Sequence, residues 1–438
     1  MDGPASIAPI PPGHRLTLTW RLARRRPGNR CSPANIACMT SNEVLIAGAG
    51  IGGLAAALAC RRAGATVRVF ERAPVFGEVG AGIQIGPNVT RILHAWGLAD
   101  VLRQVAAFPD RLQVRSAGSG RELGVLPLGA SALQRYGAPY ATIHRSDLHQ
   151  LLLTALMKHG SVEPELAAQV RGFSQSALSV ALEFVDGRQI DGAALIGADG
   201  LWSPVRQALL HDGDPQPSGH LAYRAMLVQQ DLPVALRSQQ VTVWLGPQLH
   251  VVQYPVRAGA GLNLVAIVHG DPDWLHAANA TPGQLANWSQ QTGAAEVLRA
   301  LRGVCAPLQA LVDAASGWRL WILCDRAPMR GAQEHACGRV ALVGDAAHPM
   351  RPYLAQGAGM AIEDAQVLGQ NLGDGSGDVA GQLQRFAGQR WQRNRRVQLR
   401  SRRNGRIFHS SGPLRWGRDA AMAVLGQRLL DLPWLYRG

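Results

Sequence analysis

From residue 43 onward, hydrophobic positions alternate between short strand-like runs and longer helix-like runs. Glu43–Ala47 and Thr66–Phe70 are short apolar runs, and between them lies the alanine-rich segment Ile51–Gly64. Short apolar runs are typical of buried strands, and a terminal glycine such as Gly64 is typical of a helix end. This order predicts a strand, a helix and a strand that form one βαβ unit. Because strands and helices alternate in this way, we expect an α/β fold. No repeat of fixed period is visible.

The pattern changes between residues 215 and 320. Val241–Leu245 and Gln248–Val256 are strand-like and separated by Gly246-Pro247, and Leu262–Val268 is a further strand-like run. Neighbouring runs joined by a tight turn indicate antiparallel strands. The α/β pattern returns after residue 338 with Arg339–Val343 and a glycine-rich turn. We therefore expect a discontinuous nucleotide-binding domain that is interrupted by an antiparallel sheet.

Composition is that of an ordinary globular enzyme. The chain has 438 residues, of which 47% are hydrophobic and 17% charged, which excludes a disordered, collagen-like or disulfide-scaffold protein. The six cysteines form no CxxC pair and no zinc-type spacing, so we expect neither a metal site nor disulfides. They fit a reducing cytoplasm. No apolar stretch has the length of a membrane span.

The net charge of +14 is unevenly distributed. Residues 1–38 contain six arginines against the single acid Asp2. Such a leader is compatible with a transit peptide or a nucleic-acid-binding arm, but it lacks an apolar core segment. A Met-Thr-Ser sequence starting at Met39 lies just before the first strand. We expect residues 1–40 to be a disordered or misassigned extension, because low hydrophobicity does not repay the entropy of ordering.

A second basic block covers Arg390–Arg406, in which Arg393, Arg396, Arg400 and Arg403 recur at helical spacing. A nucleic-acid surface is one interpretation. We favour a solvated helix face whose field attracts small anions, because no aromatic residues are interleaved.

The segment Gly48-Ala49-Gly50-Ile51-Gly52-Gly53 matches the dinucleotide fingerprint. Gly48 would make the tight turn, Gly50 would let the backbone approach a pyrophosphate, and Gly53 would allow close packing of helix on strand. Glu71 ends the next strand, where an acid binds a ribose hydroxyl. A purely structural glycine loop is the alternative. The strand before it and the helix after it favour a dinucleotide.

Two further glycine-bearing turns follow predicted strands. One is Gly197-Ala198-Asp199-Gly200, and the other is Gly344-Asp345 continuing to Pro349. Each places an acid after a glycine, an arrangement that can hold an extended hydroxylated ligand. An NAD dehydrogenase would instead carry a second Rossmann half.

These three turns, in this order, resemble those of the single-component FAD-dependent aromatic hydroxylases, from Val44 to about residue 430. Within that family the resemblance is greatest to the hydroxylases of salicylate, 3-hydroxybenzoate and 6-hydroxynicotinate. Glu78–Ile83, His144–Leu148 and Leu354–Gly357 carry it as well.

The resemblance implies tightly bound, non-covalent FAD, with NADH or NADPH as a transient co-substrate. It implies that Glu71 and Arg72 hold the adenosine end, that Arg145 reaches the cofactor and that Asp345 binds the ribityl chain. The turn of Asp199 and Gly200 would hold FAD and also take part in binding the pyridine nucleotide. The expected cofactor-binding residues are Gly48, Gly50, Gly52, Gly53, Glu71, Arg72, Arg145, Asp199, Gly200, Gly344, Asp345, Gly357 and Gly359.

Gly357 and Gly359 precede or open a helix. The free N–H groups and the positive dipole end of such a helix would stabilise negative charge on a reduced flavin. A simple helix entry is the alternative.

Hydroxylases of this kind form a C4a-hydroperoxide from reduced FAD and O2 and pass its distal oxygen to an activated ring. A base beside the substrate hydroxyl would activate the ring. His250 and Tyr254 are our candidates because they lie four residues apart on one strand and so on one face. Their pattern is similar to the His-x3-Tyr-Pro of two of these hydroxylases. A packed tyrosine and a satisfied core histidine are the alternative.

By the same resemblance Gln84, Pro352 and Tyr353 face the substrate, although Tyr353 departs from the pattern of those relatives. Tyr223 and Arg224 would shape the pocket or bind a carboxylate, or else only pack between domains.

The full expectation is an α/β protein with a Rossmann-like FAD-binding domain in two parts (41–215 and 326–380), an inserted antiparallel substrate domain (216–325) and a C-terminal helical region (381–438). It would be a cytoplasmic monomer or homodimer that binds a small aromatic substrate and O2, with no nucleic acid, no membrane and no metal. An FAD-dependent oxidase or reductase on the same scaffold, or a non-catalytic flavin-bound regulator, is the alternative function.

Overall fold

The structure is a computed structural model, and it describes residues 43–77, 81–159, 162–270, 289–373 and 377–437. The expected extension at residues 1–40 lies outside the described residues. Thr40–Gly438 forms one compact unit.

A five-stranded sheet forms the nucleotide-binding part, in the order β17-β18-β10-β1-β2. β1, β2, β10 and β18 are parallel, and β17 pairs antiparallel to β18. Three of these strands come from parts of the sequence that are far apart, which makes the sheet discontinuous as expected. The strands are β1 (Glu43–Ala47), β2 (Thr66–Phe70), β10 (Ala194–Gly197), β17 (Ala336–Cys337) and β18 (Val340–Leu342).

An eight-stranded sheet forms the substrate side, in the order β15-β16-β11-β14-β13-β12-β4-β5. It is antiparallel except where β12 pairs with β4. β4 and β5 come from residues 111–127, before the first nucleotide-binding part is complete, which the hydrophobic pattern did not indicate. The strands are β4 (Arg111–Ser116), β5 (Glu122–Pro127), β11 (Gln216–Val228), β12 (Val241–Gly246), β13 (Leu249–Val256), β14 (Gly261–His269), β15 (Gln290–Thr292) and β16 (Trp318–Asp325).

Two smaller sheets complete the strands. β3 (Gly82–Ile85) pairs with β6 (Ala141–His144), and a three-stranded sheet contains β7 (Val170–Gln175), β8 (Val180–Phe184) and β9 (Gln189–Gly192).

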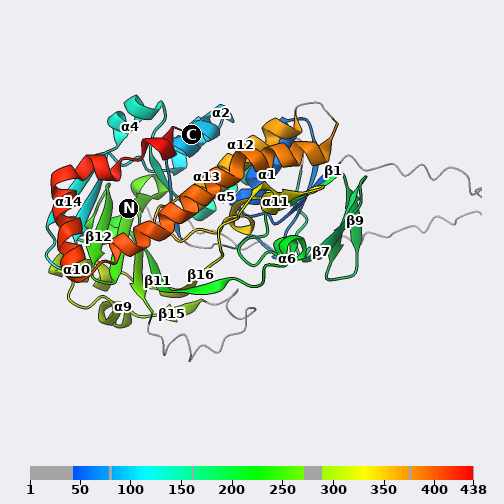
Figure 1. The fold of residues 1–438 in the computed structure, drawn as a ribbon. Coiled ribbons are helices and arrows are strands. Elements are labelled where there is room, and N and C mark those ends of the chain that lie inside the picture. The colour runs from blue at the N-terminus through cyan, green and yellow to red at the C-terminus, as the bar shows by residue number, and fades with distance from the viewer. Residues whose placement is uncertain (1–42, 78–80, 160–161, 271–288, 374–376, 438) are drawn as a thin grey trace, which may run out of the picture. The chain divides into compact units, whose positions relative to one another are not determined.

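Helices cover the five-stranded sheet and link it to the larger one (Figure 1). The largest buried cluster joins β1 to α1, α5 and α12 through residues such as Ile46, Leu54, Leu152 and Leu368. The helices are α1 (Ile51–Arg62), α2 (Pro87–Ala95), α3 (Ala99–Val105), α4 (Gly129–Tyr136), α5 (Arg145–Lys158), α6 (Pro204–Leu210), α9 (Ala294–Ala300), α10 (Ala306–Asp313), α11 (Ala332–His335), α12 (Gly357–Leu372), α13 (Val379–Phe408), α14 (Gly412–Leu430) and α15 (Pro433–Tyr436). Short 3-10 turns are η1 (Gln229–Asp231), η2 (Val234–Leu236), η3 (Arg257–Gly259) and η4 (Gly344–Ala346).

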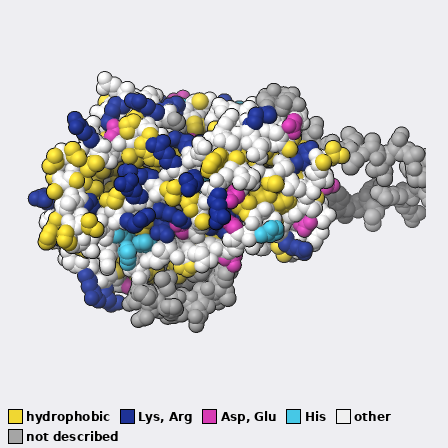
Figure 2. Space-filling model, in the orientation of Figure 1, with side chains coloured by type: hydrophobic (Ala, Val, Ile, Leu, Met, Phe, Trp, Pro, Cys, Tyr) yellow, Lys and Arg dark blue, Asp and Glu magenta, His cyan; other side chains and the backbone are white. Residues whose placement is uncertain are grey.

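The basic block lies on α13, the long helix that crosses the molecule in Figure 1. Figure 2 shows Lys and Arg side chains gathered over this helix. Arg390, however, is buried and paired with Glu363 and Asp364, and Arg393 also bonds Glu363. The expectation of a uniformly solvated face is therefore wrong for these two residues. Their acidic partners lie on the preceding helix α12, 26 to 30 residues earlier in the sequence.

The observed architecture confirms the expected α/β class with an antiparallel substrate sheet and a helical C-terminal region. Among the described residues, every helix is too short or too polar to cross a membrane.

Candidate active site

The three glycine-bearing turns meet at one edge of the five-stranded sheet. β1 pairs with β10 and β10 with β18, all parallel, so their carboxyl ends lie side by side. Ala198 N–H donates to Ala47 O (2.8 Å), and Val343 N–H donates to Gly197 O (2.9 Å). A cavity of about 900 Å³ lies against all three turns and extends to the large sheet.

Glycine is required at two positions of the first turn. Gly48 has φ +98°, and a Cβ there would lie 2.5 Å from Ala198 O. A Cβ on Gly53 would lie 1.8 Å from Gly48 O. Gly53 is not among the residues that line the cavity. It allows α1 to pack directly on the turn that follows β1.

Gly50 has no such structural requirement. Its φ of −70° is open to any residue, and a Cβ there would meet nothing within 4 Å. Gly50 lines the cavity and is the N-cap of α1, with no side chain capping the helix. The free N–H groups of this helix end face a space that a side chain would fill, which suits a phosphate.

Glu71 follows β2 and holds the first turn from the other side. Its carboxylate accepts hydrogen bonds from Ala49 N–H (2.8 Å) and Ala73 N–H (3.0 Å). Glu71 and its neighbour Arg72 both line the cavity.

A buried arginine fixes the second turn to the third. Arg206 donates to the carbonyl oxygens of Ala346 (2.9 Å) and Ala347 (2.7 Å), and it is also paired with Asp212 (2.7 Å). The turn at 197–206 and the turn at 344–349 therefore form one rigid wall.

Asp364 on α12 supports the third turn from beneath. Its carboxylate accepts from Gly344 N–H (3.2 Å), Arg390 Nε (2.8 Å) and Asn394 Nδ2 (2.9 Å), and it lies 2.5 Å from His348 Nε2. Burial alone would raise the pKa of Asp364, but His348 and Arg390 hold it well below its ordinary value. Asp364 is thus a permanent buried anion that orders the turn carrying Asp345.

Asp199 in the second turn retains unused bonding capacity. Its Oδ2 accepts from Val205 N–H (3.1 Å), whereas Oδ1 is buried without a partner among the described residues. Burial raises the pKa of Asp199 to about 6. A hydroxyl donor on a ligand would satisfy this oxygen.

The start of α12 (Gly357) and the three turns together surround the cavity and form a cradle. Gly357 lines the cavity, and the N-cap residue Gln356 makes no capping bond with its side chain. Gly359 lies outside the cavity, and a Cβ there would approach Val89 Cγ2 to 2.9 Å. It therefore allows α12 to pack on α2.

His250 and Tyr254 lie on one face of β13, and both line the same cavity. His250 is fully buried, and its Nδ1 lies 2.7 Å from His409 Nε2. Burial lowers the pKa of His250 to about 3, with a further contribution from His220. Burial also raises the pKa of Tyr254 well above its ordinary value, although Arg224 opposes the shift. Near neutral pH both side chains are uncharged.

The other substrate-side candidates divide into two groups. Gln84 and Pro352 line the cavity, and Gln84 Oε1 accepts from Tyr140 O–H (2.7 Å). Tyr353 does not line it. Its ring is buried behind the wall, 5.2 Å from the ring of His250, and packs on Gly405.

The remaining predicted residues are placed as follows. Tyr223 packs outside the cavity and donates to Glu296 (3.5 Å), whereas Arg224 lines it. Those that line the cavity are Gly48, Gly50, Gly52, Glu71, Arg72, Gln84, Arg145, Asp199, Gly200, Arg224, His250, Tyr254, Gly344, Asp345, Pro352 and Gly357.

The apolar part of the cavity wall was not predicted from the sequence. Val252 lies between His250 and Tyr254 on the same face of β13, and Val265 and Ile267 alternate on β14. Strand alternation would have identified Val252, because every second residue shares a face. Val265 and Ile267 are placed by the register in which β14 pairs with β13, which the sequence pattern does not give. Met350 also lines the cavity, from the loop after β18.

Comparison with known proteins agrees with this geometry. Residues 41–385 match the family model described as an FAD binding domain. The chain is 40% identical to 3-hydroxybenzoate 6-hydroxylase 1 of Aquipseudomonas alcaligenes, over 85% of this chain and 91% of that protein. It is 34% identical to 6-hydroxynicotinate 3-monooxygenase of Bordetella bronchiseptica, over 85% of this chain and 93% of that protein. The solved structure of a salicylate hydroxylase substrate complex is similar to this chain with a TM-score of 0.75, at 25% identity over 91% of this chain and 96% of that one.

The geometry of the cradle is itself compatible with FAD. Gly50 leaves open the space that a pyrophosphate needs, and Asp199 Oδ1 is left for a hydroxyl group. These relatives are monooxygenases, which supports a hydroxylase rather than an oxidase or a flavin-bound regulator. The chain therefore belongs to the single-component FAD-dependent aromatic hydroxylases.

Proposed function

We propose that this enzyme hydroxylates a small aromatic or heteroaromatic acid that already carries a ring hydroxyl, using FAD, NADH or NADPH, and O2. The main observation in support is that His250, Tyr254 and Arg224 line the same cavity as the three turns. The relatives named above act on 3-hydroxybenzoate, 6-hydroxynicotinate and salicylate, according to their names. Each of these is a monocyclic ring with a hydroxyl and a carboxylate.

The three turns would hold the cofactor. The N-terminus of α1 at Gly50 would bind the pyrophosphate, Glu71 and Arg72 the adenosine end, and Asp345 the ribityl chain. The N-terminus of α12 at Gly357 would stabilise negative charge on the flavin ring. When bound and reduced, FAD supplies the activation of O2 from which one oxygen atom enters the substrate ring.

His250 would act as the base that accepts the substrate's phenolic proton. Burial keeps the imidazole neutral near pH 7 but also makes it a weak base, so proton transfer requires that a bound anionic substrate raise the pKa of His250. Nδ1 is occupied by the contact with His409, so Nε2 is the nitrogen left for substrate. Removal of the phenolic proton increases electron density in the ring and prepares it for attack by an electrophilic oxygen.

Arg224 would bind the substrate carboxylate. Its Nε is buried without a partner among the described residues, and its guanidinium lies 5.1 Å from the centroid of the Trp321 ring. Burial lowers the pKa of Arg224, and Arg145 adds to the shift, so the region favours an anion. A carboxylate would satisfy both charge and hydrogen bonding.

The apolar residues Val252, Val265, Ile267 and Met350 would keep the reacting ring dry. Exclusion of water strengthens the interactions made by Arg224 and protects reactive species from hydrolysis.

A panel of substrates tests this proposal. We expect 3-hydroxybenzoate, salicylate or 6-hydroxynicotinate to stimulate NAD(P)H oxidation with formation of a hydroxylated product, and benzoate and the methyl ester of the preferred acid to do so poorly. The test measures NADH, NADPH and O2 consumption together with product by mass spectrometry. NAD(P)H oxidation that yields only hydrogen peroxide with every acid would instead indicate an oxidase.

We further propose a cytoplasmic monomer or homodimer with the domain division stated above. The thiols of Cys60, Cys305, Cys324 and Cys337, the described cysteines, are all free, which suits a reducing compartment. Size-exclusion chromatography with light scattering tests the oligomeric state.

A further inference from the structure

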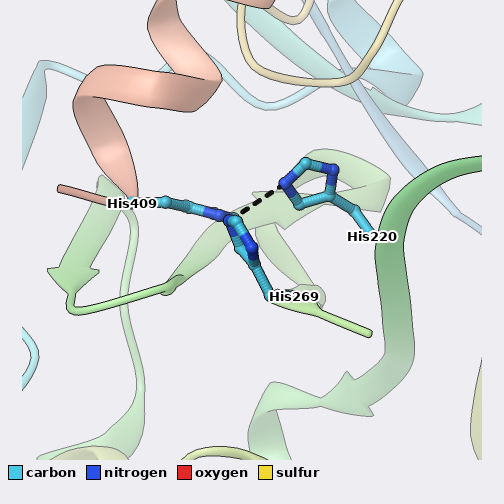
Figure 3. Close-up of side chains that lie close together, drawn as sticks. All are labelled: His220, His269 and His409. Atoms are coloured by element: carbon cyan, nitrogen blue, oxygen red, sulfur yellow. Dashed lines mark hydrogen bonds between the residues drawn. The ribbon is translucent and has the colours of Figure 1, made fainter. Parts of the chain in front are cut away.

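Three histidines from distant parts of the sequence meet beside the flavin cavity. His220 lies on β11, His269 ends β14, and His409 caps the end of α13. Figure 3 shows the three rings pointing toward one another. One ring nitrogen from each lies within 4.8 Å of the other two. No zinc-type spacing links these positions, so the sequence could not indicate the cluster.

The spacing is close to that of a metal site. His220 Nε2 and His269 Nε2 are 3.2 Å apart. Tetrahedral zinc with Zn–N bonds of about 2.0–2.1 Å separates its ligand nitrogens by about 3.3 Å. The ring of His409 lies 5.2 Å from that of His220 and 5.0 Å from that of His269, measured between centroids. Modest side-chain rotation would bring its nitrogen into the same coordination sphere.

Two arginines near the cluster act against a bound cation, whereas the histidines themselves are neutral. Burial lowers the pKa of His220 to about 4 and that of His409 to about 2, so both present neutral nitrogens near pH 7. The nearby charges are Arg351 beside His220 and Arg418 beside His409. Arg418 is paired with Asp419 (2.8 Å), whereas Asp325 is shared by Arg351 (2.8 Å) and Arg402 (2.9 Å), so one positive charge near the cluster is unbalanced and the three imidazoles must bind a cation against it.

The cluster has an unused ligand atom and a path to solvent. His409 is buried, and its Nδ1 has no hydrogen-bond partner within the described part of the chain. His269 is exposed, and Figure 2 shows histidine side chains at the surface near the end of α13. A cation can therefore reach the three rings without passing through the flavin cavity.

We propose that His220, His269 and His409 form a binding site for a divalent transition-metal cation of the Zn²⁺ class, with its fourth position open to solvent. Three imidazoles with an open position suit Zn²⁺, whereas Mg²⁺ and Ca²⁺ require oxygen ligands. A hydrogen-bonded cluster that binds no metal is the competing state, and its existing bond is the one between His220 and His269.

The site is linked to the flavin cavity by the contact between His409 Nε2 and His250 Nδ1 (2.7 Å). A cation on Nδ1 of His409 would leave the proton on Nε2, which would then donate to His250 Nδ1. His250 would keep its own proton on Nε2 and could not accept one from substrate. This consequence, unlike metal binding itself, rests on the proposed function of His250.

Zinc binding to the FAD-loaded enzyme tests the site. The probe is ZnCl2 alone, titrated by competition with a chromophoric zinc chelator near pH 7.5. We expect one Zn²⁺ per chain with a dissociation constant on the order of one micromolar or tighter. His269→Gln and His220→Gln should each weaken binding by about tenfold or more, since loss of even an outer partner of a ligand has an effect of that size.

His159→Gln is the matched control, because it removes an exposed histidine at the end of α5. It should bind Zn²⁺ as the unaltered enzyme does. His269→Gln alone decides the question if His220→Gln fails to fold. No zinc bound at 100-fold above that concentration, or unchanged binding by His269→Gln, would overturn the proposal.

A second measurement separates the two inferences. Zn²⁺ should inhibit substrate hydroxylation in the unaltered enzyme at the concentrations that saturate the site, and His269→Gln should require about tenfold more. Binding that is lost in His269→Gln but has no effect on turnover would leave the metal site intact and contradict the role of His250.

Discussion

At the residue scale, we propose that Gly50 is a glycine in order to leave room for a ligand. Its backbone is ordinary and a Cβ would contact nothing, so the protein alone gives no reason for glycine. We expect Gly50→Val to fold with a melting temperature near that of the unaltered enzyme but to purify with little FAD. Flavin absorbance per chain and thermal unfolding check this.

Gly388→Val is the control for that experiment, since Gly388 is exposed on α13 and a Cβ there also meets nothing within 4 Å. It should retain flavin. Full flavin content in Gly50→Val would contradict the assignment of the pyrophosphate to this helix end.

His250 offers a second prediction at the residue scale. His250→Gln should keep FAD, because the three turns are unchanged, but it should lower product formation by about 10²–10⁴-fold, the usual effect of a general base. NAD(P)H oxidation should continue, with a larger share of O2 recovered as hydrogen peroxide. His159→Gln serves as control, and unchanged coupling in His250→Gln would contradict the assignment.

Individual residues were predictable where a local rule applies. His250 and Tyr254 share a face because a strand alternates, and the fingerprint glycines follow a strand–turn–helix pattern. Tyr353 was expected at the substrate but lies behind His250, because its position is set by Gly405 and His409, which belong to another helix and its cap. No spacing rule within the sequence relates these residues.

At the scale of elements, α12 and α13 are joined by buried charge. Arg390 on α13 is paired with Glu363 and Asp364 on α12, and all three side chains are nearly inaccessible. Arg390→Leu would leave the buried Asp364 without its arginine partner and would leave Glu363 with Arg393 as its remaining arginine partner. We expect a loss of about 3–5 kcal/mol in the free energy of unfolding, measured by denaturant titration, together with reduced flavin content.

Arg395→Leu is the matched control, because Arg395 lies on the exposed side of the same helix. Its effect should stay within about 0.5 kcal/mol. Equal losses in the two variants would show that helix propensity, not the buried ion pair, sets the stability.

The elements themselves were predicted well where hydrophobic periodicity is strong. The expected strand at Thr66–Phe70 has the bounds of β2, and the expected strand at Gln248–Val256 differs from β13 by one residue. The joining of β4 to β12 could not be predicted, because the two strands are more than 100 residues apart and pair in parallel. The domain division remains a prediction.

At the scale of the whole molecule, stability should fall in mild acid. His335 is fully buried, and burial lowers its pKa from 6.5 to about 3. Below pH 6.5 this histidine is therefore protonated in the unfolded chain but stays neutral in the folded chain, so the free energy of unfolding decreases as pH falls. Between pH 8 and pH 5 this group alone should lower the free energy of unfolding by about 1–2 kcal/mol.

His335→Gln should reduce that pH dependence, and denaturant titrations of both proteins at pH 8 and pH 5 measure it. The exposed residue His159 supplies the comparison, since His159→Gln should leave the pH dependence unchanged. An identical slope in His335→Gln would show that another group controls acid stability.

The strand order of the central sheet has a consequence for biosynthesis. β10 lies between β1 and β18, so the cradle needs residues from Gly48 to Gly357 before it can close. At about 5–20 residues per second, translation adds Gly344 roughly 14–55 s after Phe70. A nascent chain that ends before β18 has the fingerprint turn but lacks one wall of the cradle. We therefore expect the flavin to bind only after residue 357 has been added, and ribosome-bound chains arrested before residue 340 should be colourless.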